Sequence, residues 1–327
     1  MNTPLLEVTA LESHFKLRGG TVRAVDGVSL AVNEGEVVGL VGESGCGKTT
    51  LARAIVGLAP ATSGRIAFEG TDLTNLPAAA RHRLRPGMQL IFQDPYASLN
   101  PRMTVFDAIA EPLLTHRLAT RADAPRTVAL LMDKVGLARR YVRKYPHEFS
   151  GGQRQRIAFA RALALKPRLI LADEPVSALD VSVQAQILNL LRNLCADERL
   201  AMLFISHDLA VVRHMAQRIA VMYLGHIVET APRPALFAQP AHPYTRALLS
   251  AIPVPDPDHA HKHRYATPKG DPPSPMHPPA GCPFHTRCPY AQPACSAQPP
   301  PLACVGKEHF AACICHDQLP PFKQHTG

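Results

Sequence analysis

The sequence predicts an α/β protein that carries a smaller C-terminal unit, and three observations support this prediction. Residues 1 to about 250 alternate between short apolar runs and amphipathic stretches, as strands and helices do in an α/β domain. A glycine-rich segment directly follows one apolar, β-branched run, and this order is typical of a loop that connects a buried strand to a helix. From Pro253 onward, the tail holds 17 of the 32 prolines and half of the 16 histidines. We therefore expect one large domain over residues 1–252 and a Pro- and Cys-rich extension over residues 253–327.

The elements of the large domain follow from the spacing of its apolar residues. Short apolar runs predict buried strands over residues 36–41, 169–172 and 201–205. Each run precedes a stretch with helical spacing, over residues 47–57, 181–195 and 208–215. Since no strand run lies between Thr104 and Tyr145, we expect a helical subdomain over about residues 100–165. The tail should bury little apolar surface, so we expect its fold to be stabilised by a cross-link such as a bound metal.

Charge and hydropathy limit the classes of function. The net charge of +9 permits a nucleic-acid or membrane-surface partner, but we interpret it as a solvated surface rich in Arg and expect no nucleic acid. No run of 18 apolar residues is present, and the N-terminus lacks the basic-then-apolar pattern of a signal peptide. We therefore expect the chain to stay in the cytosol.

Residues 42–49 read GESGCGKT and match the phosphate-binding pattern G-x-x-x-x-G-K-[ST]. Glycines let the backbone curl so that its N–H groups point at phosphate oxygens, and the following helix offers its N-terminus to the same anion. Lys48 should reach the β- and γ-phosphates, and Thr49 should supply a hydroxyl to Mg²⁺. ATP and Mg²⁺ are therefore the expected cofactors. The residues that we expect to hold the nucleotide here are Gly42, Glu43, Ser44, Gly45, Cys46, Gly47, Lys48, Thr49 and Thr50.

Three polar residues end two of the predicted strands. Asp173 follows the run 169–172 and is placed to hold Mg²⁺ through water. Because neighbouring strand residues point to opposite sides, Glu174 should have a different role, as the general base that polarises the attacking water. His207 ends the strand 201–205, at the edge where α/β sheets bind ligands, and should sense the phosphate.

A second anion site is predicted at Ser150-Gly151-Gly152-Gln153, before a helix over residues 154–165. A Ser and two glycines that open a helix suit a phosphate. One domain needs only one phosphate loop, so this second site makes sense if it serves a nucleotide held by another subunit.

These residues together resemble the ABC ATPase family, whose signature motif is matched by 149–153 with Phe149 in place of the commoner Leu. The resemblance covers residues 5 to about 252 and implies a P-loop NTPase core with an antiparallel β subdomain and a helical subdomain. It implies that ATP lies between the Walker loop of one subunit and the signature helix of the other. It also implies that Phe15 stacks on adenine and that Gln93 contacts Mg²⁺ and couples to the membrane partner. Residues 177–180, which end in Asp180, match the D-loop of the family, and His207 matches its switch histidine.

Longer strings at residues 93–101, 145–150 and 242–249 resemble the dipeptide and oligopeptide importers, a branch that includes nickel and glutathione members. Similarity is greatest to the second ATPase of the dipeptide permeases. The resemblance implies ATP-driven import of di- and oligopeptides, with nickel or glutathione as other cargoes. A soluble ABC-type ATPase that acts on nucleic acid is the less favoured alternative.

The same resemblance implies the partners and the location of the chain. The expected partners are a second ABC ATPase, different or identical, two integral membrane permeases and, indirectly, a periplasmic peptide-binding protein. The expected location is the cytoplasmic face of the bacterial inner membrane.

Six of the eight cysteines lie between residues 282 and 315. Cytosolic proteins rarely keep disulfides, so such a cluster suggests a metal. The C-x₂-C pairs of zinc ribbons are missing, whereas four thiolates at uneven spacing can hold an iron–sulfur cluster. The resemblance extends into this tail, and some members look able to bind a [4Fe–4S] cluster. The expected ligands are Cys282, Cys288, Cys295 and Cys313, with Cys304 and Cys315 in reserve; zinc or free thiols stay open.

Overall fold

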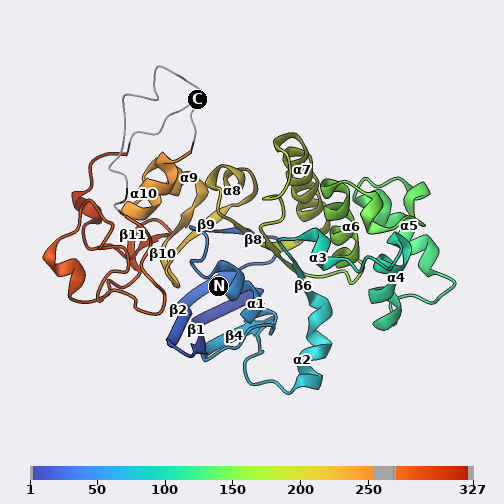
Figure 1. Ribbon diagram of the computed structural model, residues 1–327, viewed down its shortest axis with the longest axis horizontal. Helices are drawn as coiled ribbons and strands as arrows, with labels where there is room; N and C mark the ends of the chain where they lie inside the picture. Colours follow the sequence, from blue (N-terminus) through green and yellow to red (C-terminus); the bar gives the residue numbers. More distant parts are fainter. Residues whose placement is uncertain (1–2, 253–267, 269, 323–327) are drawn as a thin grey trace.

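The computed structural model describes residues 3–252, 268 and 270–322 (Figure 1). The described residues form two sheets. The eight-stranded sheet has the order β11 (Ala303–Gly306), β12 (His309–Ala311), β10 (His226–Pro232), β9 (Arg218–Tyr223), β3 (Val37–Val41), β8 (Ala201–Ser206), β7 (Leu169–Asp173) and β6 (Met88–Ile91). The antiparallel four-stranded sheet has the order β2 (Gly20–Val32), β1 (Leu6–Leu17), β4 (Ser63–Phe68) and β5 (Thr71–Asp72).

The helices follow the strands along the chain, as the sequence pattern predicts. They are α1 (Lys48–Ile55), α2 (Ala78–Leu84), α3 (Pro95–Ser98), α4 (Val105–Thr115), α5 (Ala124–Lys134), α6 (Gly151–Leu163), α7 (Val181–Glu198), α8 (Leu209–Met215), α9 (Arg233–Ala238) and α10 (Pro243–Ser250). Short 3-10 turns are η1 (Arg85–Gly87), η2 (Arg139–Tyr141), η3 (Pro146–Glu148), η4 (Pro293–Ser296) and η5 (His316–Gln318). None of the helices in the described part of the chain combines the length and apolarity needed to cross a membrane.

Parallel pairing in the middle of the large sheet places the ends of three strands side by side. β3 pairs in parallel with both β8 and β9, and β7 pairs in parallel with β8. Every residue of β3 and β7 is buried, which explains why both read as continuous apolar runs rather than alternating ones. Because parallel strands end at the same edge, the residues that follow β3, β7 and β8 meet there.

The two predicted subdomains are present. The antiparallel sheet of β1, β2, β4 and β5 confirms the expected β subdomain, and α4 to α6 form the expected helical region between β6 and β7. Figure 1 shows this helical region at one end of the molecule and the C-terminal segment at the opposite end. The helix after the signature residues starts earlier than predicted, at Gly151 rather than Arg154, because Ser150 caps it: its side chain accepts a hydrogen bond from the backbone N–H of Gln153.

The tail is less independent than its composition predicts. β12 pairs antiparallel with β10 and extends the large sheet, and β11 pairs with β12. Phe284 is fully buried and belongs to the same core cluster as Tyr223 and Tyr244. The tail therefore buries its apolar side chains in a core that the large domain supplies, which the sequence pattern does not predict. The boundary predicted between residues 252 and 253 adjoins the undescribed residues 253–267, so the division into domains stays a prediction.

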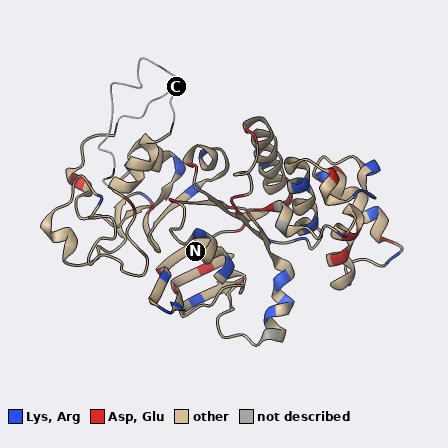
Figure 2. Cartoon of the chain, in the orientation of Figure 1, with Lys and Arg blue, Asp and Glu red and all other residues tan. Residues whose placement is uncertain are grey.

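Basic residues occur on many elements. Within the described residues, Figure 2 shows Lys and Arg on α2, on the helical region and on the antiparallel sheet, interspersed with Asp and Glu. This distribution agrees with the interpretation of the net charge as a solvated surface.

Candidate functional site

The phosphate-binding loop lies between β3 and α1. Gly47 precedes the helix with φ 110°, and a Cβ on it would lie 2.0 Å from the carbonyl oxygen of Ala24. Only glycine fits such a position, because other residues rarely adopt this φ and the backbone of β2 leaves no room. The buried Lys48 ammonium donates to the carbonyls of Gly42 (2.8 Å) and Glu43 (2.9 Å). The lysine charge is thus held at the centre of the loop.

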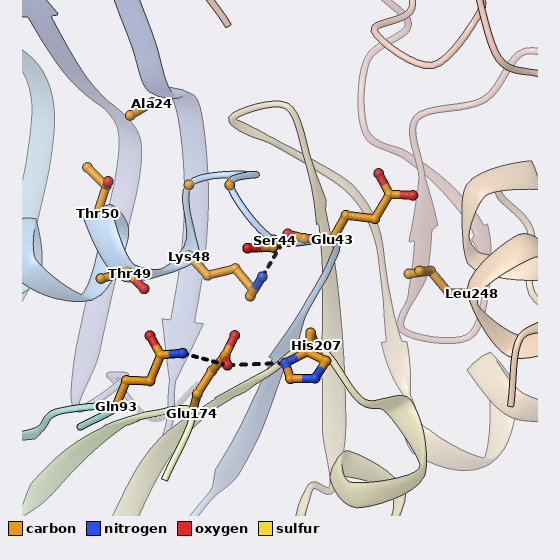
Figure 3. Close-up of a pocket in the computed structure, with 12 residues that line it drawn as sticks. Ala24, Glu43, Ser44, Lys48, Thr49, Thr50, Gln93, Glu174, His207 and Leu248 are labelled. Carbon is orange, nitrogen blue, oxygen red and sulfur yellow. Dashed lines mark hydrogen bonds and ion pairs between the residues drawn. The ribbon is translucent and has the colours of Figure 1, made fainter. Parts of the chain in front are cut away.

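A cavity of about 600 Å³ opens beside this loop (Figure 3). This volume is in the usual range for a small-molecule site. From the predicted loop set, the residues that line it are Glu43, Ser44, Gly45, Gly47, Lys48, Thr49 and Thr50. Gln93, Glu174 and His207 line the same cavity. Sequence reasoning missed two further lining residues. Ala24 on β2 belongs to no motif, and Leu248 on α10 lies in the string 242–249 but was assigned no role at the nucleotide site.

Two predicted loop residues lie behind the cavity wall. Gly42 contributes its carbonyl to Lys48, and Cys46 is buried with its Sγ 3.7 Å from the Lys48 ammonium. Burial raises the pKa of the Cys46 thiol, so this group stays neutral at physiological pH.

Two of the three predicted magnesium residues contact each other, and the third, Gln93, contacts Glu174. The Thr49 hydroxyl donates to Asp173 Oδ1 at 3.0 Å, although the residues are 124 positions apart. Asp173 ends β7 and is buried; this burial raises the pKa of its carboxyl, while the hydrogen bond from Thr49 acts in the opposite direction. A hydroxyl and a carboxylate at one point are oxygen donors of the kind that Mg²⁺ prefers.

Glu174 is held by three contacts. Its φ of 46° is in the left-handed region, and its backbone N–H donates to the carbonyl of Ile205 at 3.0 Å. A strained backbone of this kind is often found at functional positions. The Gln93 amide donates to Glu174 Oε2 at 3.1 Å, and His207 Nδ1 lies 3.1 Å from the same oxygen (Figure 3). Three residues predicted separately from sequence therefore meet at one carboxylate oxygen.

Other predicted nucleotide residues do not line this cavity. Phe15 lies on β1 opposite Val22 and is partly exposed. Residues 150–153 open α6 in the helical region, and Asp180 precedes α7. A Cβ on Gly152 would lie 2.3 Å from Val183 Cγ1, so this glycine permits close packing against α7. The roles of these residues toward a nucleotide stay predictions.

Five cysteines of the tail line one small cavity between α10 and the C-terminal segment. They are Cys282, Cys288, Cys295, Cys313 and Cys315. Burial raises the pKa of Cys288 to about 11 and that of Cys313 to about 12. The described residues contain no group of three or more His, Cys, Asp or Glu side chains arranged to hold a metal ion.

One reserve ligand lies apart from the other cysteines. Cys304 is exposed, lies outside the cysteine cavity, and donates to the carbonyl of Gly306, because the pairing of β11 with β12 turns it away. Cys315 lines the cavity, with its Sγ 4.0 Å from that of Cys295.

Sequence reasoning also missed contacts that the tail and α10 make with the phosphate loop. Arg287 Nη1 lies 2.8 and 3.1 Å from the two carboxylate oxygens of Glu43. The Glu43 backbone N–H donates to the hydroxyl of Tyr244 at 2.7 Å. No local pattern predicts an ion pair between residues 244 positions apart.

Comparison with known proteins identifies the class to which this fold and site belong. The family described as ABC transporter matches residues 25–177, and the one described as oligopeptide/dipeptide transporter, C-terminal region, matches residues 228–295. The chain belongs to the ABC transporter family and is an ATP-hydrolysing cassette.

Curated relatives extend the match over nearly the whole chain. The chain is 50% identical over 325 residues to the oligopeptide transport ATP-binding protein OppF of Salmonella typhimurium, covering 96% of this chain and 97% of the relative. It is 51% identical over 312 residues to the putative oligopeptide transport ATP-binding protein YkfD of Bacillus subtilis, covering 95% of each. The resemblance to the peptide importer branch is thereby confirmed.

A solved structure shares the fold. The ATP-binding cassette MJ0796, in a dimeric post-hydrolysis state bound to ADP and Pi, matches with a TM-score of 0.64 and 27% identity. The match covers 70% of this chain and 98% of that cassette. The predicted P-loop fold with its two subdomains is confirmed.

Proposed function

We propose that the chain hydrolyses ATP at a site completed by a second ATPase subunit, and so energises the import of di- and oligopeptides through two membrane permeases. The observation that carries this proposal is the convergence of Gln93 and His207 on Glu174 beside the phosphate loop. Nucleotide binding alone does not require the Glu174 carboxylate to be oriented by both Gln93 and His207, whereas hydrolysis does.

The residues divide the work of hydrolysis among them. The loop N–H groups and Lys48 bind the phosphates, as in other P-loop enzymes. Thr49 and Asp173 would hold Mg²⁺, which supplies positive charge to the β- and γ-phosphate oxygens. Glu174 orients the attacking water and accepts its proton. Gln93 and His207 fix the carboxylate in place, and Gln93 reports its position to the permease.

A second subunit would complete the site with its own signature helix. Ser150 to Gln153 line no part of the described cavity of this chain, although they open a helix at an exposed N-terminus. The related cassette MJ0796 was solved as a dimer bound to ADP and Pi, which supports the same arrangement here. We propose a different ATPase as the partner, with a second copy of this chain as the alternative.

The cargo and the location are inferred from the relatives. Both quoted relatives are named for oligopeptide transport, and the C-terminal family is named for oligopeptides and dipeptides. We therefore propose peptides rather than nickel or glutathione. The chain would act at the cytoplasmic face of the inner membrane, where it binds the permeases and responds indirectly to a periplasmic binding protein.

We also propose a [4Fe–4S] cluster in the cysteine cavity, with zinc as the alternative. Cys282, Cys288, Cys295 and Cys313 all line it, and Cys315 is a fifth available thiol. The cavity measures about 20 Å³, roughly the space of one water molecule, so the thiolates would have to move apart to admit a cluster. Anaerobic purification followed by analysis for iron, sulfide and zinc tests the proposal. Stoichiometric zinc without sulfide would contradict it.

Reconstitution tests the main proposal. The chain is assembled with its partner ATPase and permeases in proteoliposomes, and ATP hydrolysis and uptake of labelled peptide are measured together. We expect Glu174→Gln to retain ATP binding and to slow hydrolysis and uptake by about two orders of magnitude or more. Glu198→Gln, at an exposed carboxylate on α7, should behave like the wild type. Hydrolysis that drives uptake of glutathione or nickel but not of peptide would refute the cargo.

A further inference from the structure

The C-terminal segment reaches the phosphate loop through Arg287. This side chain is 9% exposed, and its Nη1 contacts both carboxylate oxygens of Glu43, at 2.8 and 3.1 Å. Its Nε donates to the carbonyl of Gly270 at 3.1 Å, and its Nη1 is 3.5 Å from the hydroxyl of Tyr223. Arg287 is thus held by groups on several segments in addition to Glu43.

Glu43 is fixed at its backbone as well. Its N–H donates to the buried hydroxyl of Tyr244 on α10 at 2.7 Å. Figure 3 shows its side chain directed away from Lys48 and the rest of the cavity. Two residues from the last third of the chain therefore hold Glu43: Tyr244 binds its backbone N–H, and Arg287 binds its carboxylate.

The charge of Glu43 makes its position important. It is the only acidic residue in the loop 42–49, and it lines the cavity that the phosphates of ATP would occupy. A carboxylate free to turn toward the phosphates would repel them, since like charges a few ångströms apart at a partly buried site are only weakly screened by water and salt. An arginine that holds this carboxylate outward removes the repulsion and neutralises the charge.

We propose that Arg287 is a positioning residue for ATP binding, which holds the Glu43 carboxylate away from the phosphates and so makes nucleotide affinity depend on the C-terminal segment. The inference rests on the proposed ATPase function and deepens it. It gives the segment between Cys282 and Cys288 a defined effect on the nucleotide site.

Replacing the charge tests the proposal. In the full-length chain, Arg287→Gln should raise the Kd and KM for ATP about fivefold to tenfold, with kcat changed by less than about twofold, because the change acts on phosphate binding rather than on Glu174. Arg287→Lys should recover part of the affinity, since it keeps a charge but loses the planar geometry. Arg65→Gln is the matched control; it breaks an exposed pair with Asp72 on the antiparallel sheet and should leave KM unchanged.

A double variant separates positioning from a purely structural role. In Arg287→Gln/Glu43→Gln, no carboxylate is left to restrain, so the Kd for ATP should return to within about twofold of the wild type. If the single variant weakened binding only by loosening the tail, the second change would restore nothing. An unchanged Kd in Arg287→Gln, or the same weakening in the double variant, overturns the proposal. A wild-type chain that neither binds nor hydrolyses ATP would instead refute the proposed function.

Discussion

Replacing Phe284 by alanine should loosen the attachment of the C-terminal segment to the large domain. The ring is fully buried, 5.3 Å from the ring of Tyr223 in an edge-to-face arrangement and 5.3 Å from that of Tyr244. Both tyrosines belong to the large domain, on β9 and α10. The substitution therefore removes contacts that connect the segment to the core, rather than contacts within the segment.

The size of the effect follows from this burial. A buried Phe→Ala change costs about 3–5 kcal/mol, from lost burial and the cavity left behind. A loss of about 3 kcal/mol corresponds to about a hundredfold in an equilibrium constant. The population in which the segment is detached should rise by about this factor. Phe284→Leu keeps much of the volume and should have a clearly smaller effect.

Amide hydrogen exchange measures the detachment directly. The N–H of Ala312 donates to the carbonyl of Val228 on β10 at 2.8 Å, so its protection reports whether β12 is paired. We expect exchange at Ala312 to be about a hundredfold faster in Phe284→Ala, with amides of β7 little changed. Equal exchange in the variant and the wild type would show that the segment is held without this ring, and would refute the reasoning.

Three further predictions concern other parts of the molecule. Thr49→Val removes the hydroxyl bonded to Asp173, and a magnesium titration of ATPase activity should show a half-maximal concentration raised about tenfold, or about 1.4 kcal/mol; an unchanged value would exclude Thr49 from the magnesium site. Burial lowers the pKa of His226 below its ordinary 6.5, so the unfolded chain binds more protons just below that pH. His226 should therefore reduce stability as the pH falls from 7 toward 5, and denaturant curves of His226→Gln should lack this part of the decline. As a test of the proposed cluster, Cys304→Ser should leave the iron content unchanged and Cys295→Ser should lower it; equal loss in both would contradict the assignment of the cluster to the cysteine cavity.

The sequence predicts which of these side chains meet at the phosphate loop because they follow local patterns. The run Val37–Val41 is buried on both faces, so it is continuously apolar, and the glycines after it are required by the turn. Asp173 and His207 each follow such a run, and parallel pairing alone brings the strand ends together. No long-range information is needed to expect these residues at one edge.

The tail could not be predicted in the same way. Its composition correctly indicates too few apolar residues for a core of its own, but it does not show that Phe284 packs against the large domain. The pairing of β12 with β10 joins segments about 80 residues apart, and neither strand has a distinctive pattern. The contact of Arg287 with Glu43 depends on this docking, so it follows only once the tail is in place.

The position of β12 has a consequence for any shortened form of the protein. β12 covers β10 in the large sheet, where it pairs residues 229 and 230 of β10 with residues 311 and 310, and β11 lies outside it at the edge. Without it, β10 would present unpaired N–H and C=O groups to other chains, and such open edges promote aggregation. Truncation before residue 309 should therefore yield a chain that self-associates, whatever its affinity for nucleotide. The extension thus protects β10 from intermolecular strand addition.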